Sequence, residues 1–387
     1  MKNAFLNETK TKRALAEFIM DAPRLSMGEQ CFEFEKEFST YQRCKDSVLF
    51  NSGGSANLAM VQALLNLGML KIGDAVGYSA LTWSTNVMPI IQLGLIPVAI
   101  DCEATTLNVM STQLLERLND TPIKALFITN ALGSSGDLQK IKEICDENKI
   151  VLFEDNCESL GTELESGRTG NFGVMASHSF FVAHHMSTIE GGMVCTNNSE
   201  LAAMLRIVRA NGWDRNLDAD DQTKWRKKFN VDSEFEAKYT FYDLGYNLRP
   251  TEITGFLGRN QLKYLDENIK IRNENHRFFE PIIANNSDLI SLQYGHVKYI
   301  SSFSFTVLCK TKELRDFYVS QFSGAGVEIR PVIAGNMQSQ PFYSKYVKDK
   351  YDLPGTQFIH DCGFYFGNYP ELNRADLQVL KSCLTKI

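Results

Sequence analysis

Short apolar runs alternate with amphipathic helical segments through the first two-thirds of the chain. The run "SVLF" (47–50) ends at the glycine turn "NSGGS" (51–55), and "ANLAMVQALLNL" then repeats apolar residues at helical spacing, which predicts strand, turn and helix. A second strand is predicted at "ALFITNALG" (125–133), followed by the helix "DLQKIKEICDENK" and the strand "IVLFED". This alternation favours a mostly parallel sheet covered by helices on both faces.

The pattern changes after residue 245. A long polar, helix-like segment (251–279) precedes the alternating run "SSFSFTVL" (301–308) and a further helix, which predicts a smaller α+β domain. We therefore expect a large domain over residues 1–245 and a small C-terminal domain over residues 246–387. Before this boundary, the charge-dense stretch "WDRNLDADDQTKWRKKFNVDSEFEAKYTF" has no glycine or proline and predicts a surface excursion.

Composition and charge narrow the class of protein. The 387 residues allow two domains, and a hydrophobic content of 44% supports well-filled cores. A formal net charge of −6 disfavours a nucleic-acid binder, which normally carries a basic surface. Any anionic ligand must therefore be met by local positive groups.

The apolar stretches and the cysteines disfavour further classes of protein. The start, "MKNAFLNETK", lacks the apolar centre of a signal peptide, and the most apolar run, "VMPIIQLGLIPVAI", is short and interrupted by Pro89 and Gln92. We expect a cytoplasmic protein that does not enter a membrane. Nine scattered cysteines without a CxxC motif disfavour a disulfide framework, a zinc ribbon and an iron–sulfur cluster, and no metal site is predicted.

The glycine turn is the first candidate for chemistry. Gly53 and Gly54 follow a predicted strand and precede a helix, so their amides lie at a helix N-terminus, where a phosphate is favoured. A plain tight turn between strand and helix is the alternative. The chain has neither GxGxxG nor GxxxxGK[ST], so it lacks a dinucleotide fingerprint and a Walker loop.

Two side chains after other predicted strands suit a planar, cationic ring. Asp155 ends the strand "IVLFED", at the sheet edge where α/β proteins bind ligands, and could pair with a protonated pyridine nitrogen. Glu158 follows near the same edge, and Trp83 could stack its indole on a ring. The alternatives are a helix cap or ion pair for Asp155 and a core position for Trp83.

Half of the six histidines fall within eight residues, at His178, His184 and His185. In an extended segment the adjacent pair would point to opposite sides and would not easily bind one metal ion. A single neutral histidine is a good general acid or base at cellular pH. A structural histidine is the alternative.

Together, these motifs resemble the sugar aminotransferase family of fold-type I pyridoxal-phosphate (PLP) enzymes, the DegT/DnrJ/EryC1/StrS type, which modify nucleotide-linked keto sugars. The resemblance includes the turn Ser52–Ser55, "SFFVAHHMSTIEGG", "GYNLRP" (245–250) and "GVEIRPVIAGN" (326–336), and runs along essentially the whole chain. It implies a large, mostly parallel α/β/α domain and a smaller C-terminal α+β domain.

One departure from the family pattern is informative. The family has a lysine five residues after the serine at Ser179 and six before the glutamate at Glu190, and both counts arrive at His184. No lysine occurs between Lys149 and Lys224, so no neighbour stands in for it. Histidine can relay protons but cannot bind the cofactor covalently as lysine does.

This His-for-Lys pattern resembles the 3-dehydratase branch of the family. The branch holds its cofactor non-covalently, with pyridoxamine phosphate (PMP) as a natural resting form, and regenerates PMP with L-glutamate. The resemblance implies removal of the C3 hydroxyl of a nucleotide-linked 4-keto-6-deoxy sugar, with GDP as the favoured nucleotide and a hexose or a heptose as the sugar. A related branch carries an iron–sulfur cluster, which the scattered cysteines here do not supply.

The resemblance also implies a role for each candidate residue and a homodimer with active sites at the subunit interface. His184 is the expected acid/base, Asp155 pairs with the ring nitrogen, Glu158 approaches the 3-hydroxyl and Trp83 stacks on the ring. The phosphate is met by Gly53, Gly54, Ser55 and Ser179, with Asn247 from a second subunit. The candidates for binding glutamate carboxylates or nucleotide phosphates are Arg215, Arg249 and Arg330, with surface ion pairs as the alternative.

Two other functions remain open from the sequence. An ordinary sugar aminotransferase would need the missing lysine. A catalytically silent sugar-nucleotide-binding protein could keep the fold without it.

Overall fold

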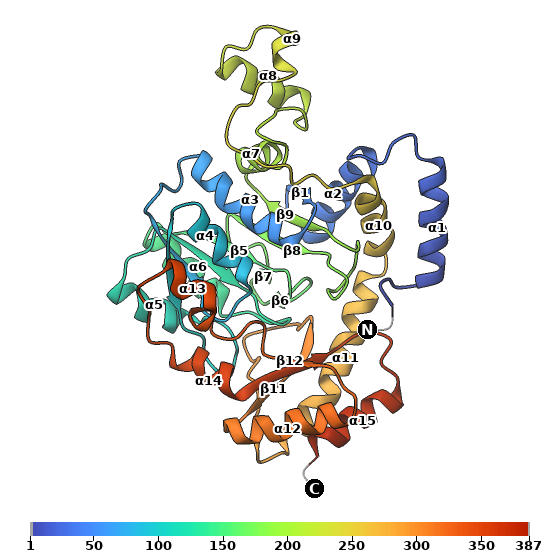
Figure 1. Ribbon diagram of the computed structural model, residues 1–387, viewed down its shortest axis with the longest axis vertical. Coiled ribbons are helices and arrows are strands. Elements are labelled where there is room, and N and C mark those ends of the chain that lie inside the picture. Colours follow the sequence, from blue (N-terminus) through green and yellow to red (C-terminus); the bar gives the residue numbers. More distant parts are fainter. Residues whose placement is uncertain (1–2, 386–387) are drawn as a thin grey trace.

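The computed structural model describes residues 3–385, which form a seven-stranded central sheet and a smaller C-terminal sheet (Figure 1). The central strands lie in the order β1-β9-β8-β5-β4-β2-β3. Strand β9 runs antiparallel to its neighbours β1 and β8, and the other six strands all run in one direction. The carboxyl ends of the other central strands therefore share one edge. Their bounds are Asp46–Phe50 (β1), Ala75–Ser79 (β2), Ile96–Ile100 (β3), Ala125–Thr129 (β4), Val151–Asp155 (β5), Met175–Ser179 (β8) and Gly192–Thr196 (β9).

Helices cover both faces of the central sheet. Helices α3, α4 and α7 form a core on one face, and α2, α5 and α6 lie on the other. Alternate strand residues serve the two cores: Val48 and Phe50 contact the first, and Leu49 contacts the second. The helix bounds are Glu29–Gln42 (α2), Gly53–Asn66 (α3), Met88–Gln92 (α4), Ser111–Asp120 (α5), Leu138–Glu147 (α6) and Ser199–Arg209 (α7).

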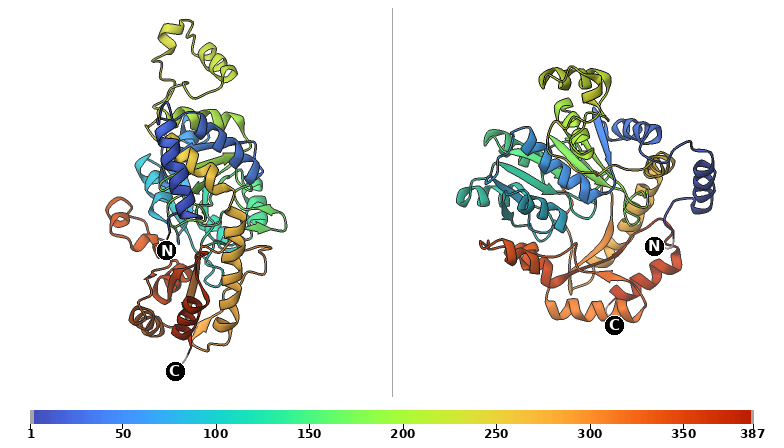
Figure 2. Two further views of the ribbon diagram at one scale, coloured as in Figure 1. Left: turned by 90° about the vertical axis from the view of Figure 1, so that its right-hand side faces the viewer. Right: turned by 45° about the horizontal axis from the view of Figure 1, so that its top comes forward.

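The C-terminal sheet is antiparallel, with strands in the order β10-β11-β13-β12. Helix α11 connects the two parts (Figure 2), since Leu265 and Ile269 near its start pack with α2 while Phe279 near its end lies in the C-terminal core. The bounds are Leu265–Ala284 (α11), Leu289–Ile290 (β10), Ser304–Cys309 (β11), Lys312–Gly324 (α12), Ile329–Arg330 (β12), Met337–Ser339 (η2), Pro341–Tyr346 (α13), Pro354–Cys362 (α14), Gly363–Gly367 (β13) and Arg374–Leu384 (α15).

The charge-dense stretch forms the predicted surface excursion, with α8 and α9 projecting at the top of Figure 1. Its base is fixed by Asp214, whose carboxylate accepts hydrogen bonds from Arg226 Nε at 2.8 Å and Tyr242 Oη at 3.2 Å. The remaining elements are Glu8–Asp21 (α1), Ser84–Asn86 (η1), Glu163–Leu164 (β6), Gly167–Arg168 (β7), Ala219–Lys228 (α8), Glu234–Ala237 (α9) and Glu252–Leu262 (α10).

The predicted α/β architecture is confirmed, with one difference in detail. The segment expected as one helix over 251–279 is two helices, α10 and α11, because the helix is interrupted at Lys263 and Tyr264, where neither glycine nor proline marks a break. The division into domains at residues 245 and 246 stays a prediction. No helix within residues 3–385 combines the length and apolarity needed to cross a bilayer.

Candidate active site

The carboxyl end of β1 leads into the glycine turn at the N-terminus of α3. Ser52 caps this helix, and its Oγ accepts a hydrogen bond from Ser55 N at 3.0 Å. Gly53 and Gly54 are the first two helical residues, whose amides have no acceptor inside the helix. A Cβ on Gly53 would lie 2.7 Å from the Cβ of Ser179, so glycine lets the turn approach the end of β8. These free amides suit a phosphate group.

Asp155 ends β5 close to this turn and is 5% exposed. Its Oδ1 accepts a hydrogen bond from Cys157 N at 2.9 Å, and its Oδ2 accepts one from Asn57 Nδ2 at 3.0 Å. Asn57, on α3, also donates to Thr85 Oγ1 at 3.1 Å. A buried carboxylate held by neutral donors keeps its charge available for a cation, such as a protonated pyridine nitrogen.

Glu158 and Trp83 lie along the same edge of the sheet. Glu158 Oε2 accepts a hydrogen bond from Leu132 N at 3.1 Å, and burial, reinforced by the charge of Asp155, raises the pKa of Glu158 to about 8. Its carboxyl group can therefore hold a proton near neutral pH. Trp83 follows β2 and is 57% exposed, so it is not a core residue and its indole face is open to a planar ring.

His184 lies in the turn that joins β8 to β9. Its amide donates to Phe181 O at 2.9 Å, and its ring packs edge-on against Phe303, with 5.2 Å between the ring centroids. Nδ1 is buried and has no hydrogen-bond partner within the described residues. Burial lowers the pKa of His184 to about 4; Arg272 contributes to the lowering and Asp155 opposes it. The ring is therefore neutral at pH 7 and can accept a proton.

The other two histidines of the cluster are structural in their contacts. His185 is fully buried, and its Nε2 is 2.9 Å from Ser301 O. His178 is fully buried and packs edge-on against Phe38. Because His184 and His185 lie in a turn rather than an extended strand, both rings contact Phe303. Across residues 3–385, no group of three or more His, Cys, Asp or Glu side chains is arranged to hold a metal ion.

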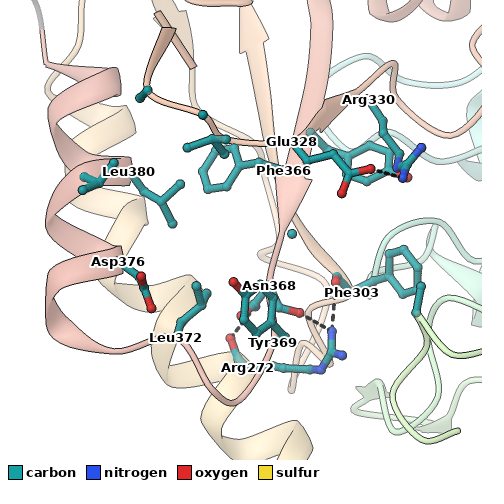
Figure 3. Close-up of a pocket in the computed structure, with 17 residues that line it drawn as sticks. Arg272, Phe303, Glu328, Arg330, Phe366, Asn368, Tyr369, Leu372, Asp376 and Leu380 are labelled. Atoms are coloured by element: carbon teal, nitrogen blue, oxygen red, sulfur yellow. Dashed lines mark hydrogen bonds and ion pairs between the residues drawn. The ribbon is translucent and has the colours of Figure 1, made fainter. Parts of the chain in front are cut away.

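The three candidate anion-binding arginines lie in two separate places. Arg215 and Arg249 line a pocket of about 510 Å³ together with Asn247, whose Oδ1 accepts a hydrogen bond from Arg249 Nε at 3.0 Å. Arg330 lies instead in a cavity of about 540 Å³ in the C-terminal part, where it forms an ion pair with Glu328 (Figure 3). Arg330 thus already has an anionic partner.

Arg24 is a further member of the first pocket that the sequence did not reveal. It lines the pocket with Arg215 and Arg249, and none of the described residues around that pocket is acidic. A Cβ on Gly28 would lie 2.4 Å from Arg24 Nη2, so the guanidinium rests on the backbone of that glycine. The bridge between Ser26 and Thr251 brings Arg24 to this pocket, and no local sequence pattern predicts a pairing between residues so far apart in the chain.

Asn57 is a second residue that the sequence reasoning missed. It is 1% exposed, and its Oδ1 has no hydrogen-bond partner among the described residues. A signal for it did exist, because Asn57 lies one turn after Gly53 in a helix whose residues 56–65 are apolar apart from Asn57 and Gln62. The buried amide of Asn57 hydrogen-bonds Asp155 at the edge of the sheet.

The arrangement as a whole fits a PLP-type cofactor. The free amides at Gly53 and Gly54 suit its phosphate, Asp155 suits a protonated ring nitrogen, and the exposed indole of Trp83 suits the ring face. His184 contributes a neutral imidazole near Asp155, since the charge of Asp155 acts on its pKa.

Comparison with known proteins identifies the family. The family model described as "DegT/DnrJ/EryC1/StrS aminotransferase family" matches residues 7–385. The GDP-4-keto-6-deoxy-D-mannose 3-dehydratase of Escherichia coli O55:H7 is 32% identical over 356 residues, covering 91% of this chain and 90% of that protein. The enzyme of the same name from Yersinia pseudotuberculosis is 33% identical over 360 residues, covering 91% and 89%.

A solved structure of a similar enzyme has the same fold as this chain. A crystal structure of GDP-4-keto-6-deoxymannose-3-dehydratase with a trapped PLP–glutamate geminal diamine superposes with a TM-score of 0.89 and 30% sequence identity, and 97% of each chain is covered.

Proposed function

Because this chain belongs to the DegT/DnrJ/EryC1/StrS aminotransferase family, we propose that it is a PLP/PMP-dependent 3-dehydratase of a nucleotide-linked 4-keto-6-deoxy sugar. L-Glutamate regenerates PMP, and the products are a 4-keto-3,6-dideoxy sugar, ammonia and 2-oxoglutarate. GDP is the nucleotide that the relatives' names support. The observation that carries the proposal is His184 at the position where the family has its cofactor-binding lysine.

Residues from several strand ends would hold the cofactor. Gly53, Gly54, Ser55 and Ser179 would bind its phosphate, Trp83 would stack on its ring, Asp155 would pair with its ring nitrogen and Glu158 would bind its 3-hydroxyl. When bound, the cofactor supplies an amine for the C4 ketone of the sugar and a ring that accepts electrons. Asp155 supports the second role because its buried charge favours the protonated ring nitrogen.

His184 moves the protons. Its imidazole is neutral at pH 7, so a ring nitrogen can take up a proton and return it to the C3 hydroxyl as that group leaves. Phe303 and Phe181 pack edge-on beside the ring. Because burial disfavours the protonated ring, a proton taken up by His184 is readily passed on to the departing hydroxyl.

Arg24, Arg215 and Arg249 bind the diphosphate of the nucleotide. The three arginines line one pocket whose described lining residues include no acid, so the pocket suits an anion with two negative charges. Arg330 has Glu328 as its partner and is the weaker candidate for an anion.

Replacing Arg24 with glutamine should raise the KM for the nucleotide sugar by about 10-fold or more, because a hydrogen bond to a charged group is worth roughly 1.5–3 kcal/mol. The kcat should change little, since Arg24 contacts no reacting atom. Initial rates at varied sugar concentration test this. Arg13→Gln, an exposed change on α1, is the control. A rise in the KM for glutamate alone would assign the pocket to glutamate instead.

The protein acts as a cytoplasmic homodimer with its active sites at the subunit interface. Support comes from exposed apolar side chains in the segment that precedes Asn247 in the sequence: Phe235, Tyr239, Phe241 and Leu244 are 81%, 72%, 56% and 70% exposed. Asn247 is itself exposed, and its side-chain amide nitrogen could donate to the cofactor phosphate of a second subunit while Oδ1 keeps its hydrogen bond from Arg249. Sedimentation equilibrium tests the stoichiometry, and a monomer that retains full activity would contradict it.

The test of the function is an assay of GDP-linked 4-keto-6-deoxy hexose and heptose with glutamate. Ammonia, 2-oxoglutarate and a sugar lacking the C3 oxygen are expected. Borohydride reduction followed by mass spectrometry should leave the chain without covalently bound cofactor. An aminated sugar as the product would favour the aminotransferase alternative, and no turnover with any nucleotide-linked 4-keto sugar would favour the silent binding protein.

A further inference from the structure

Helix α11 binds the backbone of the turn that carries His184. Arg272 Nη2 donates a hydrogen bond to His184 O at 3.3 Å, and Asn268 Nδ2 donates one to His185 O. The two side chains are also joined to each other, because Arg272 Nε donates to Asn268 Oδ1 at 2.9 Å. One linked pair of side chains therefore holds two successive carbonyl groups of the turn.

The same guanidinium reaches two further segments of the chain. Arg272 Nη1 donates to Phe303 O at 3.0 Å and to Asn368 O (Figure 3). Asn368 Nδ2 donates in return to Arg272 O at 2.8 Å. Since the ring of Phe303 packs against His184, Arg272 fixes both the backbone of the histidine and the aromatic residue beside it.

The imidazole of His184 has few contacts of its own to orient it. Its Nδ1 has no hydrogen-bond partner within the described residues, and its ring contacts are the edges of Phe181 and Phe303. A base whose ring nitrogens must stay free for proton transfer can be oriented only through its backbone and its neighbours. The contacts made by α11 meet that requirement.

The burial of Arg272 is a second, independent observation. The side chain is 2% exposed, and its hydrogen bonds within residues 3–385 go to carbonyl oxygens and an amide, with no direct ion pair to a carboxylate. Burial lowers the pKa of Arg272 to about 10, and the charge of Glu371 opposes this effect. A buried guanidinium without a paired carboxylate destabilises a fold unless its hydrogen bonds compensate. Arg209, the other fully buried arginine, pairs conventionally with Glu35.

We infer that Arg272 and Asn268 are positioning residues: they hold the backbone at His184 and His185 so that the imidazole is aligned for proton transfer. This inference rests on the proposed function, in which His184 is the acid/base. It extends the active site to α11, a helix that begins in one core of the protein and ends in another.

The first test is Arg272→Lys, because a lysine ammonium cannot reach all the acceptors that the guanidinium spans. The conversion of bound PLP to PMP by glutamate is followed by stopped-flow absorbance. We expect its limiting first-order rate constant to fall roughly 10- to 100-fold, as for a misplaced catalytic group. The glutamate concentration for half-maximal rate should stay nearly unchanged. A first-order constant does not depend on the fraction of folded protein, so lost stability alone would not lower it.

Arg209→Lys is the matched control. It makes the same chemical change at a side chain that is equally buried but contacts Glu35 and Leu49 instead of the His184 turn. It should lower the melting temperature as Arg272→Lys does, and it should leave the rate constant unchanged.

Asn268→Asp distinguishes an effect on the His184 turn from an effect on the stability of the protein. The aspartate keeps an acceptor for Arg272 Nε and adds a compensating charge, but it removes the donor to His185 O. We expect unchanged or higher stability, a slower half-reaction, and faster amide hydrogen exchange in the peptide covering residues 181–190. Hydrogen exchange requires no turnover, so it reports on the turn whether or not the protein is a dehydratase.

The inference is overturned if both variants react at the wild-type rate, or if exchange in this peptide is no faster than in Arg209→Lys. A wild-type protein without a glutamate half-reaction would instead refute the proposed function, and the exchange measurement would still decide whether α11 holds the turn.

Discussion

His184→Asn should abolish both the glutamate half-reaction and C3 dehydration while leaving the cofactor bound. With a pKa of about 4, the imidazole of His184 is neutral at pH 7 and has a ring nitrogen that can accept a proton. The side chain of asparagine cannot accept a proton at this pH. Loss of a general acid/base costs about 10²–10⁴-fold in rate. The phosphate turn and Asp155 are untouched, so binding should persist. Single-turnover absorbance with glutamate, and product analysis with the GDP sugar, measure the two losses separately.

His296→Asn is the control for this change. His296 is partly buried and its Nε2 lies 2.7 Å from Ser135 O, so the substitution tests a generic loss of a histidine contact at a residue outside the candidate site. It should retain the wild-type rate constants. If His184→Asn released the cofactor instead of slowing the chemistry, His184 would be a binding residue rather than the acid/base.

Much of the candidate site could be predicted because its residues follow strand ends. Ser52, Asp155 and Ser179 lie at or just after the carboxyl ends of β1, β5 and β8, and parallel strands bring such positions to one edge. Hydrophobic patterning was sufficient to place the glycine turn and Asp155 after predicted strands, whereas Ser179 was assigned only through the family resemblance. The missing lysine could be counted directly, because the register of His184 depends only on spacing from Ser179 and Glu190.

Other parts of the site depend on contacts that no local pattern encodes. Arg272 hydrogen-bonds the backbone of His184, which is 88 positions away in the sequence. Arg24 and Arg249 line the same pocket because the backbone at Ser26 pairs with that at Thr251. The side chains of Arg272 and Arg24 lie in helical or loop segments that look like ordinary polar surface. The sequence also grouped Arg330 with Arg215, although the fold places Arg330 in a different cavity, where it forms an ion pair with its near neighbour in sequence, Glu328.

The second large effect is expected for Asp155→Asn. The amide preserves the size of the side chain but removes the buried negative charge that favours a protonated ring nitrogen. It also removes the opposing influence of that charge on His184, so the pKa of His184 should fall further. We expect the glutamate half-reaction to slow by roughly 10²–10³-fold, the range found when one electrostatic contact to developing charge is lost. Stopped-flow absorbance measures the rate, and titration with PLP measures retained binding.

Asp101→Asn is the matched control, because Asp101 also follows a central strand and its carboxylate accepts hydrogen bonds from Gly355 N at 2.8 Å and Thr356 N at 2.7 Å. Both substitutions place an amide where backbone donors require an acceptor, so both should lower stability. Only the change at Asp155 should alter the rate constant, since Asp101 follows β3, the outermost strand at the other end of the sheet from β1, and binds the N-terminus of α14. Equal slowing by the two variants would mean that Asp155 acts through the fold, and the ring nitrogen would then need another partner.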